Sequence, residues 1–346
     1  MSESQSGDSF RAVALQITCR SVNRFSAPAD ARAAIADSIR RLDAQIGGAV
    51  GWIGGDTRLV VVPEYFLTGF PMGETAQEWA EKACLEIDGK EYEALGEIAQ
   101  RHGIFLAGNA YELDSSFPGL YFQVSFILGP SGDVVLRYRR LNSMFSPTPH
   151  DVWDRYLELY GLEGVFPVAK TEIGNLAAVA SEEILYPEVA RCMALRGAEV
   201  LVHSTCEVAS PRPTPKGITK VARAIENMAY VVSANTAGME GIPIPGASSD
   251  GGSQVIDYRG LVLAEAGPGE SIVAYAELDM AALRRYRRRP GMDNLLSRQR
   301  LELYASSYGL GDFYPPNTLS EGAPERDHFS RTQRQTIERL AAKGII

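Results

Sequence analysis

The feature that most constrains the fold is an alternation of short apolar runs with segments of helical periodicity. Leu59-Val60-Val61-Val62 is an apolar run that ends at Pro63, and a second such run covers 200–202. Apolar residues recur at helical spacing at Ile35, Ile39, Leu42 and Ile46. Strands that alternate with helices are typical of a layered α/β domain whose sheet is mostly buried.

Glycine, proline and other turn residues predict where these elements begin and end. We expect Gly47-Gly48 to end a helix over about 29–46, and Pro187 and Gly197 to bound a helix over 187–196. The turn residues 129–132 favour an antiparallel pair of strands on either side. Strands are expected at 10–17, 59–62, 104–111, 121–128, 134–138, 176–180, 200–202, 230–234, 253–256 and 261–264, with further helices at 223–229 and near 333–342.

The composition excludes several functional classes. A formal net charge of −9 argues against nucleic-acid binding, which needs a positive surface, so we interpret the arginine-rich run 284–289 as a solvated or subunit-bridging segment. No apolar run approaches the roughly 20 residues that span a membrane, and the polar start predicts a cytoplasmic protein. Four widely spaced cysteines predict free thiols and no metal site.

We expect one domain with flanking segments. Residues 1–8 are predicted to be a flexible N-terminus, 9–280 the folded domain, and 281–346 a C-terminal arm that contacts an oligomer partner or wraps the domain itself.

Several motifs stand in order along the chain. The main ones are VVPE at 61–64, YRR at 138–140 and SEEILYPE at 181–188, and RGAEV at 196–200, HST at 203–205 and RAIEN at 223–227 follow them. Together they resemble the carbon-nitrogen hydrolase (nitrilase) superfamily, amidase-like branch. In that family the first motif carries the general base, the second ends in a catalytic lysine, and the third begins with a catalytic cysteine.

The resemblance implies a fold, a chemistry and a set of partners. The fold is a four-layer α-β-β-α sandwich that forms homodimers or larger homo-oligomers, and the ligand is a small amide or carboxamide-like molecule. In the family, the cysteine attacks the carbon, the glutamate carries the proton to the leaving amine, and the lysine stabilises the oxyanion. No metal or organic cofactor is implied.

Glu64 occupies the general-base position of this resemblance. It follows a buried strand and a proline, so its carboxylate is expected at the carboxyl end of the sheet, where α/β proteins bind ligands. The alternative is an exposed loop carboxylate. The neighbouring Tyr65 is expected to contact the substrate.

Arg140 and Ser181 replace the lysine and the cysteine of the family. No lysine lies between Lys90 and Lys170, so a shift of register cannot supply one. Arginine keeps the positive charge but cannot release a proton, and it either clamps an oxyanion or forms a structural pair with Glu64.

The serine raises a similar choice. A serine hydroxyl is far less acidic than a thiol, and serine enzymes use a histidine or lysine base. Ser181 is therefore either a nucleophile or a hydroxyl that binds without attacking. Cys206 is a weak candidate for a substitute thiol.

The remaining site residues are assigned by position. The second carboxylate of the family is expected at Asp154, with Glu158 as the runner-up, and solvated carboxylates are the alternative for both. Glu158, Glu182 and His203 are expected to contact the substrate. Two functions stay open: amide hydrolysis at an atypical Glu-Arg-Ser site, or a catalytically silent relative that binds an amide-like ligand or partners an active homologue.

Overall fold

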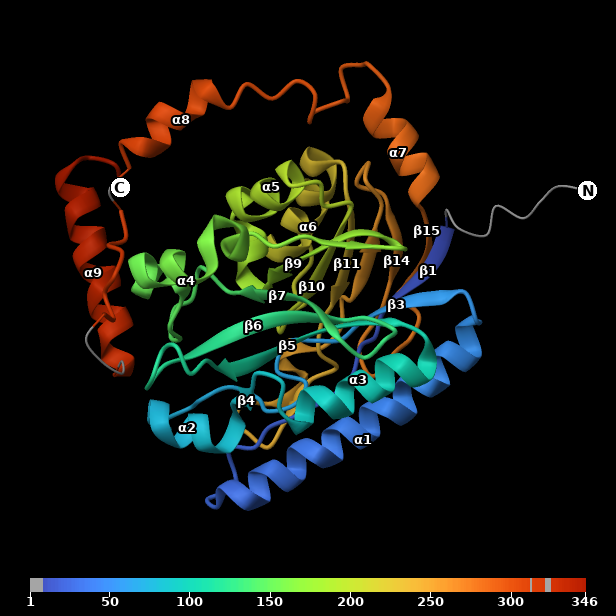
Figure 1. Ribbon diagram of the computed structural model, residues 1–346, viewed down its shortest axis with the longest axis vertical. Coiled ribbons are helices and arrows are strands. Elements are labelled where there is room, and N and C mark those ends of the chain that lie inside the picture. The colour runs from blue at the N-terminus through green and yellow to red at the C-terminus, as the bar shows by residue number, and fades with distance from the viewer. Residues whose placement is uncertain (1–8, 312, 321–324) are drawn as a thin grey trace, which may run out of the picture.

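The protein is an α/β sandwich of four layers (Figure 1). The computed structural model describes residues 9–311, 313–320 and 325–346; the predicted flexible N-terminus, 1–8, lies outside the described residues. Two β-sheets pack face to face, and helices cover the outer face of each sheet. The expected α-β-β-α architecture is confirmed.

The first sheet combines a parallel centre with antiparallel neighbours. In spatial order it contains β15 (Tyr275–Asp279), β1 (Ser9–Ala14), β3 (Thr57–Val61), β5 (Phe105–Leu113), β6 (Tyr121–Leu128) and β7 (Val134–Arg139), and β4 (Leu85–Glu86) pairs with β5. β1, β3 and β5 are parallel, and β5, β6 and β7 form an antiparallel meander. α1 (Pro28–Ile53), α2 (Ala76–Ala83) and α3 (Lys90–His102) pack on its outer face.

The second sheet has the same mixed character. Its order is β14 (Val262–Glu265), β13 (Gln254–Ile256), β11 (Tyr230–Ala234), β10 (Val200–Ser204), β9 (Gly174–Ala180) and β8 (Ala169–Thr171). β9, β10 and β11 are parallel, and α5 (Pro187–Leu195) and α6 (Pro215–Asn227) cover the outer face. The shorter elements are β2 (Cys19–Arg20), β12 (Met239–Glu240), α4 (Trp153–Val165) and the 3-10 helices η1 (Pro149–Val152), η2 (Ser181–Leu185) and η3 (Gly246–Ser249).

Strand alternation explains why this sheet pair forms two apolar cores. Along β1, Ala12 and Ala14 point into the layer between the sheets, whereas Val13 packs with Leu15 against α1 and α3. Successive side chains of a strand face opposite sides, so a strand covered on both faces is apolar at nearly every position. The continuous run 59–62 meets the same requirement in β3.

Most predicted elements are confirmed, but three helix bounds are wrong, among them the start of the last helix, which lies at Arg326 and not near Gln333. β6 and β11 have the expected bounds, and the turn at 129–132 joins antiparallel strands. α1 continues through Gly47-Gly48 to Ile53, because Ala49 and Ile53 keep the buried face apolar. α6 starts at Pro215, where the Thr214 side chain caps the helix by accepting the Gly217 N–H, and not at Arg223.

The C-terminal segment folds back on its own domain. It contains α7 (Met280–Arg288), α8 (Glu302–Gly309) and α9 (Arg326–Ala342), which follow the rim of the molecule in Figure 1. Leu319 and Phe329 pack against Phe122 of β6, and Arg287 donates to the carbonyl of Met228 at the end of α6. The arginine-rich run is thus partly docked within the chain, whereas pairing with a second copy stays a prediction.

The contact between α3 and the β6–β7 turn yields a stability prediction. A Cβ at Gly96 would overlap the carbonyl oxygen of Gly132, whereas a Cβ at Gly48, which is exposed on α1, meets nothing. We expect Gly96→Ala to lower the free energy of unfolding by about 1–3 kcal/mol. The matched Gly48→Ala change should raise it by up to about 1 kcal/mol through helix propensity. Urea denaturation checks both, and equal effects would contradict the packing described.

Candidate active site

One cavity of about 430 Å3 collects most of the residues that the sequence singled out. It lies where four strands end: Glu64 follows β3, Arg140 follows β7, Ser181 follows β9, and Cys206 lies two residues beyond β10. β3 and β10 each lie at the centre of a parallel group, and β9 is a parallel neighbour of β10, so the face-to-face sheets bring their carboxyl ends to one place. Tyr65 and Glu182 also line this cavity.

The carboxylate of Glu64 is almost fully buried, and both of its oxygens accept hydrogen bonds. Its Oε1 accepts hydrogen bonds from Gln123 Nε2 at 2.7 Å and Arg140 Nη1 at 3.3 Å. Its Oε2 accepts the backbone N–H of Cys206 at 3.0 Å. A buried charge is tolerated when it is paired and hydrogen-bonded, and these three donors meet that condition. Glu64 is therefore an anchored carboxylate and not the exposed loop residue of the alternative interpretation.

Arg140 lies between two carboxylates. Besides Glu64, its guanidinium contacts Glu182 through Nη2, and Nε donates to the Asn142 carbonyl at 2.7 Å. Burial alone lowers the pKa of Arg140, but the charge of Glu64 and its neighbours outweighs burial and raises that pKa above its ordinary value. Arg140 is a fixed cation on the cavity wall.

Glu183 holds the backbone that carries Arg140. Its Oε1 accepts the N–H groups of Leu141 and Asn142 at 2.8 and 2.9 Å, and its Oε2 accepts the hydroxyl of Tyr138 at 2.7 Å. Burial raises the pKa of Glu183 although these donors oppose the shift. Sequence reasoning missed both Glu183 and Gln123. The available signals were a second acid inside the elbow motif and an amide within the apolar run of β6.

Ser181 forms a sharp turn between β9 and η2. Its φ is 45°, a left-handed conformation that costs a non-glycine residue on the order of 1 kcal/mol or more and often occurs at functional sites. The Ser181 carbonyl accepts a hydrogen bond from His203 Nε2 at 2.8 Å, which holds the turn. A strained strand-to-helix turn is the arrangement that presents a nucleophilic side chain to a cavity.

His203 does not contact the cavity, so its expected role in substrate binding is wrong. The ring is fully buried in β10, and its Nδ1 lies 2.8 Å from Ser233 Oγ. Burial, followed by the charge of Lys220, lowers the pKa of His203 well below its ordinary value. The neutral ring donates from Nε2 to a carbonyl, so that nitrogen is not available to deprotonate the Ser181 hydroxyl.

Asp154 and Glu158 lie away from the other site residues, which corrects their expected convergence with Glu64. Asp154, in the first turn of α4, lines a separate cavity together with Asn317 and Leu319, because α4 packs beside the C-terminal segment. Glu158 is exposed and pairs with Arg155 at 2.6 Å. Besides Glu64, the carboxylate that pairs with Arg140 is that of Glu182 in the elbow, and Glu183 holds the backbone of the next two residues.

Lys216 is the functional candidate that sequence reasoning missed. It lies in the first turn of α6 and lines the cavity, with its Nζ 3.3 Å from Ser181 Oγ and 3.2 Å from Thr205 Oγ1. The available signal was Thr214-Pro215, a helix-capping residue followed by a proline in the first turn.

Cys206 fits a structural role better than that of a substitute thiol. Burial, followed by the negative charge of Glu64, raises the pKa of its thiol to about 11, so the reactive thiolate is scarce at neutral pH. Its backbone N–H, and not its sulfur, contacts Glu64.

The described residues contain neither a metal-binding cluster nor a membrane-spanning helix. No group of three or more His, Cys, Asp or Glu side chains within 9–311, 313–320 and 325–346 is arranged to hold a metal ion. In the same parts of the chain, no helix has both the length and the apolar character needed to cross a membrane.

Comparisons with known proteins agree with this architecture. Omega-amidase NIT2 of Danio rerio is 25% identical over 287 residues, which cover 83% of this chain and 94% of the relative. The crystal structure of Saccharomyces cerevisiae Nit3, a member of branch 10 of the nitrilase superfamily, matches with a TM-score of 0.64 at 22% identity, covering 83% of this chain and 96% of that one.

A second solved structure and a family model extend the match. A carbon-nitrogen hydrolase from Helicobacter pylori G27 gives a TM-score of 0.63 at 22% identity, covering 88% of this chain and 99% of that one. The model of the carbon-nitrogen hydrolase family matches residues 35–288, which contain the whole cavity. With the motifs, the sandwich and the site in agreement, this chain belongs to the carbon-nitrogen hydrolase family.

Proposed function

We propose that this protein hydrolyses the C–N bond of a small amide, with Ser181 as the nucleophile. The observation that carries the proposal is the placement of Ser181 on a strained turn at a cavity that also holds Arg140. A hydroxyl presented this way beside a fixed cation matches the requirements of acyl transfer, which needs a nucleophile and a stabiliser for the oxyanion. The omega-amidase relative supports an amide as the substrate class.

Arg140 supplies the positive charge in this proposal. Its guanidinium is held by Glu64 and Glu182, so it needs no reorganisation when negative charge develops on the substrate oxygen. Glu64 acts as the anchor of that cation. Arg140 thus replaces the charge of the family lysine while its contacts differ from those of an ammonium.

The cavity limits the substrate to a small molecule. Its volume of about 430 Å3 is near the lower end of ordinary small-molecule sites, roughly 300–1,000 Å3. Apolar side chains from the loops around 143–146 and 242–249 line the outer part, and polar groups lie at the base. We propose a small carboxamide whose amide group lies at the base.

Removing the nucleophile tests the proposal directly. We expect Ser181→Ala to lower the kcat for small carboxamides at least about 1,000-fold, because the step that forms the acyl-enzyme is lost. Steady-state ammonia release from a carboxamide panel measures this, with Ser307→Ala, at an exposed position of α8, as the matched control. Full activity in Ser181→Ala would eliminate Ser181 as the nucleophile.

Repairing the two substituted positions should give strongly non-additive gains. Each single variant, Ser181→Cys or Arg140→Lys, still has one residue that differs from the cysteine-lysine pair of the family. We therefore expect the double variant to increase the rate of amide hydrolysis by more than the product of the two separate increases. Amide and p-nitrophenyl ester hydrolysis should be measured for the parent, both single variants and the double. Adding Cys206→Ser to the double variant tests whether the introduced thiol is the reactive one. Multiplicative gains would show that the two positions act independently.

A catalytically silent binding protein is the second candidate. The observation in its favour is that both oxygens of Glu64 are engaged, by Gln123, Arg140 and the Cys206 N–H, and none of these partners is the Ser181 hydroxyl. A site with its general base engaged in this way can still recognise an amide.

Thermal denaturation with carboxamides separates the two candidates. If the protein only binds, carboxamides raise the melting temperature by mass action with no product formed. The increase in melting temperature should persist in Ser181→Ala. It should disappear in the double variant Glu182→Ala/Lys216→Met, which removes two polar groups from the cavity. Ammonia release from the parent protein would instead establish hydrolysis.

A further inference from the structure

The Ser181 hydroxyl needs a proton acceptor, and the described structure leaves few groups able to serve. Glu64 is engaged by Gln123, Arg140 and the Cys206 N–H. His203 directs Nε2 at the carbonyl of Ser181 and not at its hydroxyl. Arginine does not release its proton at the pH of ordinary enzymes, so Arg140 is excluded as a base.

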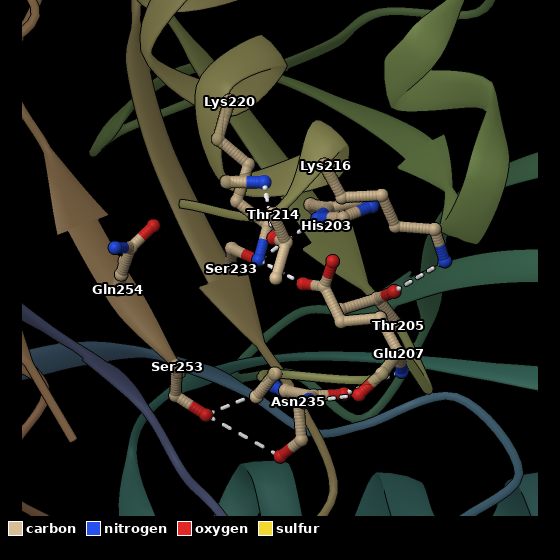
Figure 2. Close-up of polar contacts among 12 residues, drawn as sticks. His203, Thr205, Glu207, Thr214, Lys216, Lys220, Ser233, Asn235, Ser253 and Gln254 are labelled. Carbon is tan, nitrogen blue, oxygen red and sulfur yellow. Dashed lines mark hydrogen bonds and ion pairs between the residues drawn. The ribbon is translucent and has the colours of Figure 1, made fainter. Parts of the chain in front are cut away.

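Lys216 is the group in contact with the hydroxyl. Its Nζ lies 3.3 Å from Ser181 Oγ, which is within hydrogen-bonding distance. Catalytic hydrogen bonds are often this long in a site that holds no substrate. Figure 2 shows its side chain extending from the start of α6 toward Thr205, whose Oγ1 is the second contact at 3.2 Å. The Thr205 N–H donates to the Ala234 carbonyl at 3.0 Å, so this second partner is fixed by the sheet.

The partners of Lys216 differ from those of the next lysine on the same helix. Among the described residues, Lys220 forms an ion pair with the buried Glu207, whereas Lys216 contacts only the hydroxyls of Ser181 and Thr205. An ion pair stabilises the ammonium, and hydroxyls tolerate either protonation state because they both donate and accept. Lys216 therefore differs from Lys220 in its hydrogen-bond partners, and one of these partners is the Ser181 hydroxyl itself.

Other charged and titratable groups surround Lys216. The cavity that it lines also carries Glu64 and Tyr65 after β3, Tyr111 on β5, Arg140 after β7, Glu182 on η2 and Cys206 after β10. On the α6 side, burial lowers the pKa of Lys220 and of His203, and the positive charge of Lys216 lowers both further.

We propose that Lys216 is the catalytic base that deprotonates Ser181 in this site. The proposal rests on the amide hydrolysis proposed above and assigns the proton transfer to a lysine outside the family motifs. A serine with a lysine base is an established alternative to the serine-histidine arrangement.

The proton transfers balance over one turnover. Neutral Lys216 takes the Ser181 proton as Oγ bonds to the amide carbon and the carbonyl electron pair moves to oxygen. The tetrahedral oxyanion then collapses, the C–N bond breaks, and the Lys216 ammonium gives its proton to the leaving nitrogen. A water molecule attacks the resulting ester while Lys216 accepts its proton, and return of that proton to Ser181 Oγ releases the acid. The net reaction is amide plus water to acid plus amine.

Two substitutions of Lys216 distinguish a role as a general base from a role as a positive charge alone. Lys216→Met removes the amine, and Lys216→Arg keeps the positive charge but cannot accept a proton. We expect both to lower kcat by about 100- to 10,000-fold, the usual contribution of a general base. In the parent, kcat/KM should rise with pH because a general base acts in its unprotonated form, and both variants should lose this rise. The matched control is Lys170→Met, which changes an exposed lysine on β8.

The outcomes of these assays decide the assignment. Near-parent activity and an unchanged pH profile in Lys216→Arg would overturn the base role and leave only a need for positive charge. Loss of activity in Ser181→Ala together with an unaltered pH profile in Lys216→Met would keep the proposed hydrolysis and refute the base.

A titration of a cysteine introduced at position 181 does not depend on turnover. It therefore tests the pairing of Lys216 with position 181 separately from the proposed amide hydrolysis. In Ser181→Cys, the Lys216 ammonium should favour the introduced thiolate, so the pH midpoint of its alkylation by iodoacetamide should lie low. Adding Lys216→Met should raise that midpoint by about 1 pH unit or more, measured at position 181 by peptide mass spectrometry. An unmoved midpoint would overturn the pairing of Lys216 with position 181, whether or not the parent hydrolyses amides. A moved midpoint supports the pairing, and an inactive parent would then count against the proposed hydrolysis alone.

Discussion

The face-to-face packing of the two sheets determines where every group of the site lies. β3 and β10 belong to different sheets, yet the Ser204 hydroxyl donates to the Val62 carbonyl at 2.7 Å and joins their ends. Tyr138 of one sheet donates to Glu183 beside the other. Because most of the layer between the sheets is apolar, the charged side chains of the site gather where the strands end, and they must satisfy one another there.

The buried charges explain why Arg140 is tolerated at a position where the family has lysine. A guanidinium spreads its donors over a wide fork, and here the fork meets Glu64 on one side and Glu182 on the other. These ion pairs offset the desolvation of a buried cation, at the cost of engaging the carboxylate that the family uses as a base. Lys216 restores a lysine to the cavity from a different element, α6.

Sequence reasoning located the fold and three of the four expected catalytic positions in one cavity, because each of those positions follows the end of a strand within a recognised motif. It misplaced Asp154, since a helix can be recognised from its residues while the surface on which it packs cannot. It overlooked Lys216 for a related reason: α6 was expected to begin at Arg223, and the first turn that carries the lysine begins at Pro215. Helix termini depend on local capping contacts and are the least certain feature of a sequence pattern.

The sequence by itself determined the layered architecture, because strands covered on both faces must be apolar along their length and the chain shows that pattern at 59–62 and 200–202. It also predicted a serine and an arginine at the motif positions where the resemblance implies a cysteine and a lysine. Only the tertiary structure brings Lys216 next to Ser181. Contacts such as that of Lys216 with Ser181, 35 residues apart, depend on how a helix packs against a sheet, and that packing follows from the whole core rather than from any local pattern.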